Sequence, residues 1–315
     1  MAEFDAVVVG ELNVDLILQD VSSFPEMGTE KIAKDMALTM GSASAILASN
    51  LAHLGAKVGF IGKLGQDPFG EIILDTLKDH GVDCGGIQRD ETARTGVTVS
   101  MTFPSNYAMV TYMGAMESFS LHDIDFSYLS KGRHLHLSSF YLQPGLRPGC
   151  AELFRQAKEA HLTTSFDPGW DPQEEWKADI QEVLKLVDVF LPNEQEALNI
   201  SSSRTVREAL DQMDRTCQVV IIKQGEQGAI GRINGETIKI RAFEVESVDT
   251  TGAGDSFNAG FLFEWLRDSE IRQCLKAGNA CGALATTKMG GSTASPSKKE
   301  LDEFLASKTD EIFVH

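Results

Sequence analysis

The chain has 315 residues, of which 42% are hydrophobic, so it is long enough to bury a substantial core. Its 28 lysines and arginines face 46 acidic residues, and the formal charge of -18 disfavours nucleic acid, which needs concentrated positive charge. The acidic start and the short apolar run 6–9 do not fit a secretory signal, and no apolar run approaches the roughly 20 residues of a membrane span. These features predict a cytoplasmic protein without a membrane partner.

Short apolar runs that end in turn residues alternate along the chain with helical patterns. Such runs are typical of buried parallel strands, and they lie at residues 7–9, 58–61, 134–137 and 219–222. The alternation predicts a doubly wound α/β fold, in which a mostly parallel central sheet is covered by helices on both faces as a three-layer sandwich. We expect a single domain over residues 1–315.

Two pairs of strand-like segments interrupt this alternation, because no helical pattern separates their members. Residues 12–18 pair with 31–40, and residues 96–103 pair with 109–113. They predict a small antiparallel flap, inserted in the α/β body over about 11–40 and 95–114. Apolar residues on both of its faces need cover, so we expect a β-sheet lid that also offers a homodimer contact.

Residues 248–263, VDTTGAGDSFNAGFLF, place two glycines before a stretch that is apolar nearly all round, which predicts a buried helix. Gly252 and Gly254 leave the N–H groups at its start unobstructed, and the positive end of the helix dipole favours an anion there. Asp255 can take the proton of an attacking hydroxyl as a general base. The pattern predicts phosphoryl transfer. The alternative is an N-cap aspartate after a tight turn.

Two other phosphate motifs do not fit this segment. A P-loop requires Gly-Lys-Ser/Thr, whereas Asp255 and Ser256 follow Gly254. The dinucleotide fingerprint requires a third glycine where Phe257 stands, which disfavours an NAD-linked oxidoreductase.

Residues 249–255 match every fixed position of the pattern D-T-x-G-A-G-D, and on this motif the sequence resembles the ribokinase-like carbohydrate kinases, also called the PfkB family. The resemblance extends from Gly10 to about Pro296. It implies a ribokinase-like fold, ATP as phosphoryl donor and Mg²⁺ as cofactor. It also implies that Gly252, Ala253 and Gly254 form an anion hole and that Asp255 is the catalytic base.

Asn193 and Glu196, after the apolar stretch 187–191, resemble the family's N-x-x-E element. In the family these residues organise magnesium and phosphate through water, which suits an ion that keeps several waters. An ordinary helix start, with Asn193 as cap, is the alternative.

Lys223, Gly225 and Gly228 resemble the family's nucleotide-side loop, and a strand-to-hairpin turn is the alternative. The resemblance implies further nucleotide contacts at Asn193, Gly252, Ala253, Gly254 and Asn279. It also implies a potassium-type ion at Asp249, Thr251, Gly291 and Ser295.

On the acceptor side, Asn13 and Asp15 resemble the family's first strand and turn, where an aspartate binds sugar hydroxyls; an aspartate satisfied by its own backbone is the alternative. Residues 41–55 resemble the N-terminal signature G-G-x-x-x-N-x-A, but Ser42 replaces its second glycine and Ile46 its substrate-contacting asparagine. We therefore expect substrate contacts at Asn13, Asp15, Gly41, Ser42 and Ser44.

Met113 and Asp171 stand where many family members that act on ketodeoxy acids, and many fructokinases, carry arginine. A carboxylated sugar is best held by a guanidinium. The sequence therefore favours a neutral sugar of the ribose or fructose type, phosphorylated on a primary hydroxyl. A nucleoside is the runner-up, because aromatic residues such as Trp170 can stack on a base. A non-catalytic sugar or nucleotide sensor that kept the fold is the alternative of another class.

Overall fold

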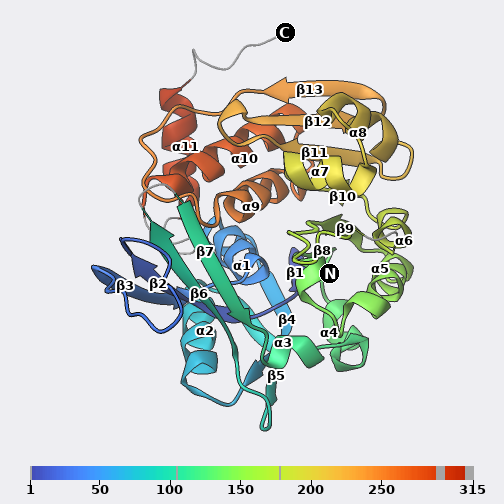
Figure 1. Ribbon diagram of the computed structural model, residues 1–315. Helices are drawn as coiled ribbons and strands as arrows, with labels where there is room; N and C mark the ends of the chain where they lie inside the picture. Colours follow the sequence, from blue (N-terminus) through green and yellow to red (C-terminus); the bar gives the residue numbers. More distant parts are fainter. Residues whose placement is uncertain (1, 104–105, 177–178, 289–294, 309–315) are drawn as a thin grey trace.

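The computed structural model describes residues 2–103, 106–176, 179–288 and 295–308 (Figure 1). Nine strands form the main sheet in the order β13-β12-β11-β10-β9-β8-β1-β4-β5. The strands from β5 to β11 are parallel, whereas β12 and β13 are antiparallel to their neighbours. The bounds are β1 (Ala6–Val9), β4 (Val58–Gly65), β5 (Asp83–Asp90), β8 (His134–Leu137), β9 (Thr163–Phe166), β10 (Val189–Phe190), β11 (Val219–Lys223), β12 (Ala229–Ile233) and β13 (Glu236–Ile240).

Helices cover both faces of the main sheet, as the strand–helix alternation predicts. One face carries α1 (Ala43–His53), α2 (Pro68–Asp79), α9 (Ala253–Trp265), α10 (Ile271–Thr286) and α11 (Lys298–Ser307). The other carries α4 (Phe126–Leu129), α5 (Cys150–Glu159), α6 (Ile180–Leu184), α7 (Glu194–Ser201) and α8 (Val206–Met213). Val8 packs in the first core and Val7 in the second, because successive strand residues point to opposite faces. The three-layer α/β prediction is confirmed.

Shorter helical pieces lie in the connections. They are α3 (Ala115–Ser118) and 3-10 turns at Leu121–Asp123, Phe140–Leu142, Arg147–Gly149 and Gly225–Gln227. Within the described ranges, no helix has the length and apolar character needed to cross a membrane.

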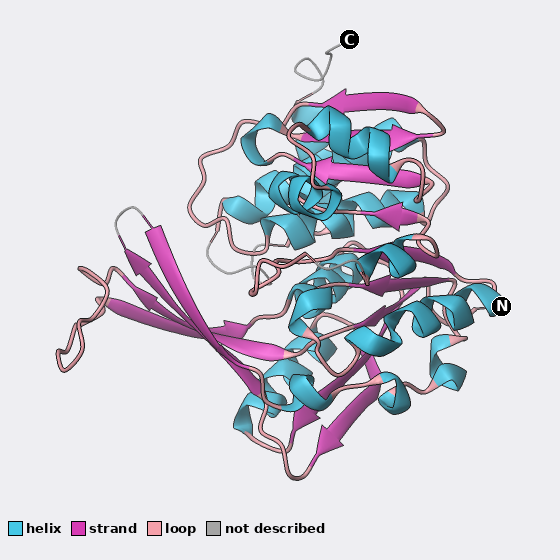
Figure 2. Cartoon of the chain, turned by 45° about the vertical axis from the view of Figure 1, so that its right-hand side comes forward, coloured by secondary structure: helices cyan, strands magenta, loops and turns pink. Residues whose placement is uncertain are grey.

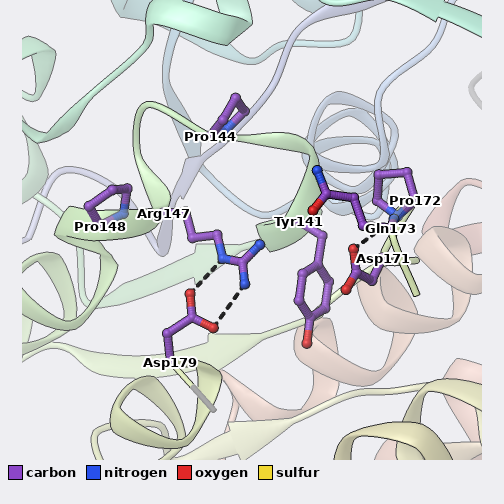
Figure 3. Close-up of a pocket in the computed structure, with 8 residues that line it drawn as sticks. All are labelled: Tyr141, Pro144, Arg147, Pro148, Asp171, Pro172, Gln173 and Asp179. Carbon is purple, nitrogen blue, oxygen red and sulfur yellow. Dashed lines mark hydrogen bonds and ion pairs between the residues drawn. The ribbon is translucent and has the colours of Figure 1, made fainter. Parts of the chain in front are cut away.

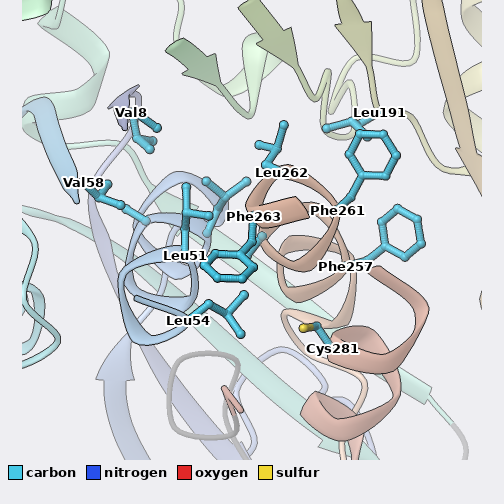
Figure 4. Packing of buried hydrophobic residues seen from close by; sticks show 14 of the residues in the cluster. Val8, Leu51, Leu54, Val58, Leu191, Phe257, Phe261, Leu262, Phe263 and Cys281 are labelled. Atoms are coloured by element: carbon cyan, nitrogen blue, oxygen red, sulfur yellow. The ribbon is translucent and has the colours of Figure 1, made fainter. Parts of the chain in front are cut away.

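Helices α1 and α9 pack against each other in the first core (Figure 4). Leu51 and Leu54 of α1 face Phe263 of α9, and the stacked rings of Phe257 and Phe261 lie on the far side of α9. Residues 256–264 are all buried, as their mostly apolar character predicts. The burial of α9 on all sides fixes the position of its N-terminus.

A small sheet projects from the body (Figure 2). Its order is β3 (Asp35–Met40), β2 (Asn13–Gln19), β6 (Gly96–Phe103) and β7 (Asn106–Tyr112). The two outer pairs are antiparallel, but the central pair, β2 and β6, is parallel. The predicted all-antiparallel flap is therefore wrong at its centre. The reason is that β2 and β6 follow the carboxyl ends of β1 and β5, two parallel strands, and so leave the body in the same direction.

The strand connections diverge between β1 and β8, which are neighbours in the main sheet. β1 leads through the small sheet and α1 to β4 on one side, whereas β8 leads through α5 to β9 on the other. In open α/β sheets, ligands bind at the carboxyl ends of the strands where connections diverge. The residues that follow these strands are therefore the first candidates for a functional site.

Candidate active site

Asp255 lies in the first turn of α9, directly after the Gly252 turn. Gly252 has φ 71°, a left-handed conformation that glycine adopts without strain. Ala253 already donates its N–H to Thr250, but Gly254 and Asp255 lie where a helix offers N–H groups without an intrahelical acceptor. A Cβ on Gly254 would lie 3.7 Å from Lys223 Nζ, so an ammonium stands beside these donors. The segment has the geometry that anion binding at a helix start requires.

A buried ion pair lies beside this helix start. Lys223, at the end of β11, donates to Asp167 Oδ2 at 2.6 Å, and Asn258 of α9 donates to the same oxygen at 2.5 Å. Lys223 Nζ also lies 3.2 Å from Asn258 Oδ1. Burial alone would raise the pKa of Asp167, but Lys223 outweighs it and the pKa falls below its ordinary value. The sequence prediction missed Asp167 and Asn258; the available signal was an aspartate directly after a buried strand.

Two other carboxyl groups share this site and are hard to ionise. Burial, reinforced by Asp167 and opposed by Lys223, raises the pKa of Asp255 to about 7. The same causes raise the pKa of Glu196 to about 7. With one ammonium among three acids, the site favours a further cation, and its hard oxygen donors fit Mg²⁺. Among the described residues no three acidic, histidine or cysteine side chains form a metal cage, and Mg²⁺ does not need one because it keeps several waters.

Asn193 and Glu196 form a reciprocal capping box at the start of α7. Asn193 Oδ1 accepts from the Glu196 N–H at 2.9 Å, and Glu196 Oε2 accepts from the Asn193 N–H at 2.8 Å. The helix-start alternative therefore describes their local geometry correctly. Glu196 also lies close enough to Asp167, Lys223 and Asp255 to feel their charges, so the cap stands within the candidate site. Its magnesium role remains a prediction.

Gly228 and Asn279 both meet the segment that follows β13. A Cβ on Gly228 would lie 2.1 Å from Ile240 O, and Asn279 donates to Ile240 O at 3.2 Å and to Arg241 O at 3.0 Å. Gly225 begins the 3-10 turn with φ 55°. Local packing thus accounts for these residues, and their contact with a nucleotide remains a prediction.

The turn before α9 is joined to the end of α10. Thr251 N–H donates to Asp249 Oδ1 at 2.9 Å, and the N–H groups of Val248 and Asp249 donate to Thr286 O. Ser295 is buried, and Gly291 lies outside the described residues. The potassium-type site remains a prediction.

Asn13, Asp15 and Gly41, which were predicted as acceptor contacts, lie together. Asn13 Nδ2 donates to Asp15 Oδ1 at 2.9 Å and to Thr98 Oγ1 at 3.1 Å, and the Gly41 N–H donates to Asn13 O at 3.0 Å. A Cβ on Gly41 would lie 2.2 Å from Asp15 Oδ1, so only glycine permits this approach. Burial raises the pKa of Asp15 to about 6, and its charge in turn helps to raise the pKa of Asp255. The two carboxyl groups are therefore close enough to interact electrostatically.

Ser42 and Ser44 use their hydroxyls within the protein. Ser42 Oγ donates to Glu11 O at 2.6 Å and accepts from the Ala45 N–H at 3.0 Å, which makes it the N-cap of α1. Ser44 Oγ donates to Glu11 Oε2 at 2.5 Å. Their predicted contact with an acceptor thus competes with these bonds. Glu11, only 2% exposed, was not singled out from the sequence, although it too follows a buried strand.

Ser42 has φ 71° and ψ 117°, a conformation that favours the glycine of the family signature. Ser42→Ala should therefore lower the free energy of unfolding by about 1–2 kcal/mol, because it loses the cap and keeps the strained backbone. Ser42→Gly should lose less, because glycine relieves the strain. Urea denaturation of both variants measures the difference in the free energy of unfolding. Equal losses in the two variants would show that the backbone at position 42 is not strained.

The side chain of Asp171 is hydrogen-bonded within the loop that follows it. Its carboxylate accepts from the N–H groups of Gln173, Glu175 and Trp176. The pocket beside it, of about 380 Å³, contains Arg147, whose guanidinium is held by Asp179 at 2.6 and 2.9 Å (Figure 3). This arginine is therefore already neutralised and does not replace the one missing at position 171.

The three-layer body, the small sheet and the glycine-led start of α9 together define a protein of the ribokinase-like class. A crystal structure of a putative ribokinase II from E. coli superposes with a TM-score of 0.88 and 25% identity, over 96% of this chain and 99% of that one. The family model described as pfkB family carbohydrate kinase matches residues 4–298, and the chain belongs to this family.

Two relatives cover nearly the full length of both chains. The ATP-dependent ribose-1-phosphate kinase of Halopiger xanaduensis is 31% identical, over 96% of this chain and 98% of its own. The fructokinase of Vibrio alginolyticus is 30% identical, over 95% of this chain and 98% of its own. The names of these relatives agree on the class of reaction and differ on the acceptor.

Proposed function

We propose that the protein transfers the γ-phosphoryl group of ATP to a primary hydroxyl of a small neutral sugar of the ribose or fructose type, with Mg²⁺ as cofactor. The observation that carries this proposal is the place of Asp255: it stands in the first turn of α9, beside N–H donors and the Lys223 ammonium, and it is close enough to Asp15 to feel its charge. This arrangement supports the roles of Asp255 as general base, of the α9 start as anion site and of Asp15 as the carboxylate that binds hydroxyls.

In the proposed reaction, Asn13 and Asp15 hold the acceptor's hydroxyls and Asp255 accepts the proton of the attacking one. The hydroxyl oxygen forms a bond to the γ-phosphorus, the bond to the bridging oxygen breaks, and ADP leaves. The N–H groups of Gly254 and Asp255, with the Lys223 ammonium, stabilise the charge on the transferred group. Mg²⁺, when bound near Glu196 and Asn193, supplies further neutralisation of the phosphates. The small sheet acts as a lid that excludes water.

The charges of the site support a neutral acceptor. Among the residues that the structure describes, Asp15 and Glu11 have no basic side chain within ion-pair distance, and Lys223 and Arg147 are each paired with an aspartate. A nucleoside is the second candidate, because Trp170 is 44% exposed on a loop whose Gly169 lies against Ser139, at the end of β8. Its indole offers a surface on which a base can stack.

A coupled ADP-release screen tests the proposal. It should include ribose, fructose, nucleosides, ketodeoxy acids and ribose 1-phosphate, each with and without potassium. We expect the highest kcat/KM with a neutral sugar. A preference for nucleosides would support the second candidate, and a preference for acidic sugars would contradict both. Thermal stabilisation by sugar or ATP without any ADP release would identify a sensor.

Activity should depend on pH through Asp255, whose pKa is raised to about 7. A base must be ionised, so protonation below this pH should lower log kcat/KM by about one unit per pH unit. The rate should be constant above about pH 8, since the carboxylate is then fully formed. A pH profile with the best acceptor measures this; an acid limb near the ordinary pKa of aspartate would contradict it.

We also propose that the small sheet forms a homodimer contact. The strand register aligns Leu38, Leu16, Val99 and Val110 in one apolar row across all four strands. Val110 is 62% exposed at the edge of this row, and an apolar face of this kind favours a partner.

Val110→Asp should therefore convert a dimer to a monomer in sedimentation velocity, because it places a charge on the apolar row. Met109→Asp is the matched control, since Met109 is equally exposed but points to the opposite face. A wild-type protein that is monomeric at micromolar concentration would contradict the proposed contact.

A further inference from the structure

Glu11 ties together the three elements that meet where the strand connections diverge. It follows the end of β1, and its backbone carbonyl accepts the Ser42 hydroxyl. Its carboxyl accepts from the hydroxyl and the N–H of Ser44 in α1, at 2.5 and 3.4 Å, and the side chain of Ser139, after β8, lies close to it. This buried carboxyl therefore sits between β1, α1 and β8, next to the acceptor contact Gly41.

The position of this carboxyl is the one that a bound anion would take. The start of α1 has the dipole and the N–H groups that attract negative charge: the Ser44 N–H and hydroxyl donate to this carboxyl, and the Ala45 N–H donates to Ser42 Oγ. A Cβ on Gly10 would lie 1.9 Å from Ser44 Oγ, so the glycine lets β1 and α1 approach closely enough for this bond. The chain thus places a carboxyl group of its own at the start of α1; burial raises the pKa of this group, and the Ser44 hydroxyl opposes that shift.

The surroundings add negative charge rather than compensate it. Glu11 and Asp15 both raise the pKa of Asp255, so the three carboxyl groups are close enough to interact electrostatically. In the described part of the chain, no lysine, arginine or histidine pairs with Glu11 or Asp15. The buried amide of Gln143, which lies near Gly10, donates to Ser138 O and Ser139 O and brings no positive charge.

We propose that Glu11 determines the class of acceptor: its carboxyl fills the anion position at the start of α1, and it thereby excludes sugars that carry a phosphate or carboxylate at the end lying over Gly41. Glu11 acts here as a specificity-determining residue and not as the base. The inference rests on the proposed function, because it takes Asn13, Asp15 and Gly41 as the acceptor site. It explains physically why the site takes neutral sugars without arginine at positions 113 and 171.

Two substitutions at Glu11 test separately the effect of its charge and the effect of its side chain filling the anion position at the start of α1. Glu11→Gln keeps the shape and removes the charge, whereas Glu11→Ser also frees the N–H and hydroxyl donors of Ser44. The ratio of kcat/KM for ribose 1-phosphate to that for the best neutral sugar should rise about tenfold or more in Glu11→Gln, because a like-charge contact is removed. It should rise at least as much in Glu11→Ser.

Matched controls separate this effect from damage to the fold. Glu11→Asp keeps the charge and should not increase the ratio, and Glu91→Gln removes an exposed carboxylate elsewhere and should leave both kinetic constants unchanged. Thermal unfolding and circular dichroism confirm that each variant is folded.

The outcomes distinguish the inference from the proposed function. A wild-type enzyme that prefers a neutral sugar, with an unchanged ratio in both Glu11→Gln and Glu11→Ser, overturns the role of Glu11 and leaves the proposed function standing. A wild-type enzyme that prefers ribose 1-phosphate overturns the proposed function and the inference with it. A higher ratio in Glu11→Gln and Glu11→Ser, but not in Glu11→Asp, supports the inference.

Discussion

Asp255→Asn should lower kcat by a factor of about 10²–10⁴, because the amide cannot accept the proton of the attacking hydroxyl. Binding of ATP should change little, since the N–H donors of α9 and the Lys223 ammonium remain in place. The variant should also be at least as stable as the wild type, because burial and Asp167 oppose the ionised form of Asp255. Initial rates, calorimetric titration with ATP and urea denaturation measure these three quantities.

Asp75→Asn is the control for this experiment, because Asp75 is an exposed aspartate of α2 far along the chain from the site. It should leave kcat unchanged. If Asp255→Asn retained more than about a tenth of the wild-type kcat, Asp255 would lose the role of general base.

Lys223→Met should lower the free energy of unfolding by about 3–5 kcal/mol, because it leaves the Asp167 carboxylate buried without its counter-charge. The Lys223–Asp167 bond is 2.6 Å long, and the two side chains are only 12% and 7% exposed. The double variant Lys223→Met/Asp167→Asn should recover much of the loss, since it removes the unpaired charge. Urea denaturation near pH 7 measures all three proteins.

Lys185 offers the matched comparison, because it pairs with Glu182 at the same distance but on the surface, where the side chains are 58% and 65% exposed. Lys185→Met should cost less than about 1 kcal/mol. A loss from Lys223→Met as small as that from Lys185→Met would show that Asp167 finds another way to satisfy its charge.

The sequence predicts the main sheet, its two helical layers and the start of α9, because these features depend on local patterns. Apolar runs mark the strands, and residues 249–255 carry the turn and the acid within one short segment. The same is true of Asn193 and Glu196, whose capping box is visible as a spacing of three. The two interpretations of this motif, a helix cap and a magnesium site, are compatible, because a helix start can also face a site.

The contacts that the sequence did not predict join residues far apart in the chain. Lys223 and Asp167 are separated by 56 positions, Asn258 and Asp167 by 91, and Glu11 and Ser44 by 33. No local pattern records such a pairing. The parallel contact between β2 and β6 was missed for a related reason, because it depends on the direction in which distant strands leave the main sheet.

Asn13, Asp15 and Gly41 belong to a single hydrogen-bonded unit with the small sheet, whereas Asp255, Lys223 and Asp167 belong to the body. On the proposed function, the two sets hold opposite ends of the acceptor, and the small sheet is joined to the body by its chain connections and by contacts of β2 and β3 with α2. The position of the small sheet relative to the body would then fix the distance between the acceptor's bound hydroxyls and its reacting hydroxyl. A sugar one carbon longer or shorter would place its reacting hydroxyl away from Asp255, and it would fail to react even if no side chain excluded it.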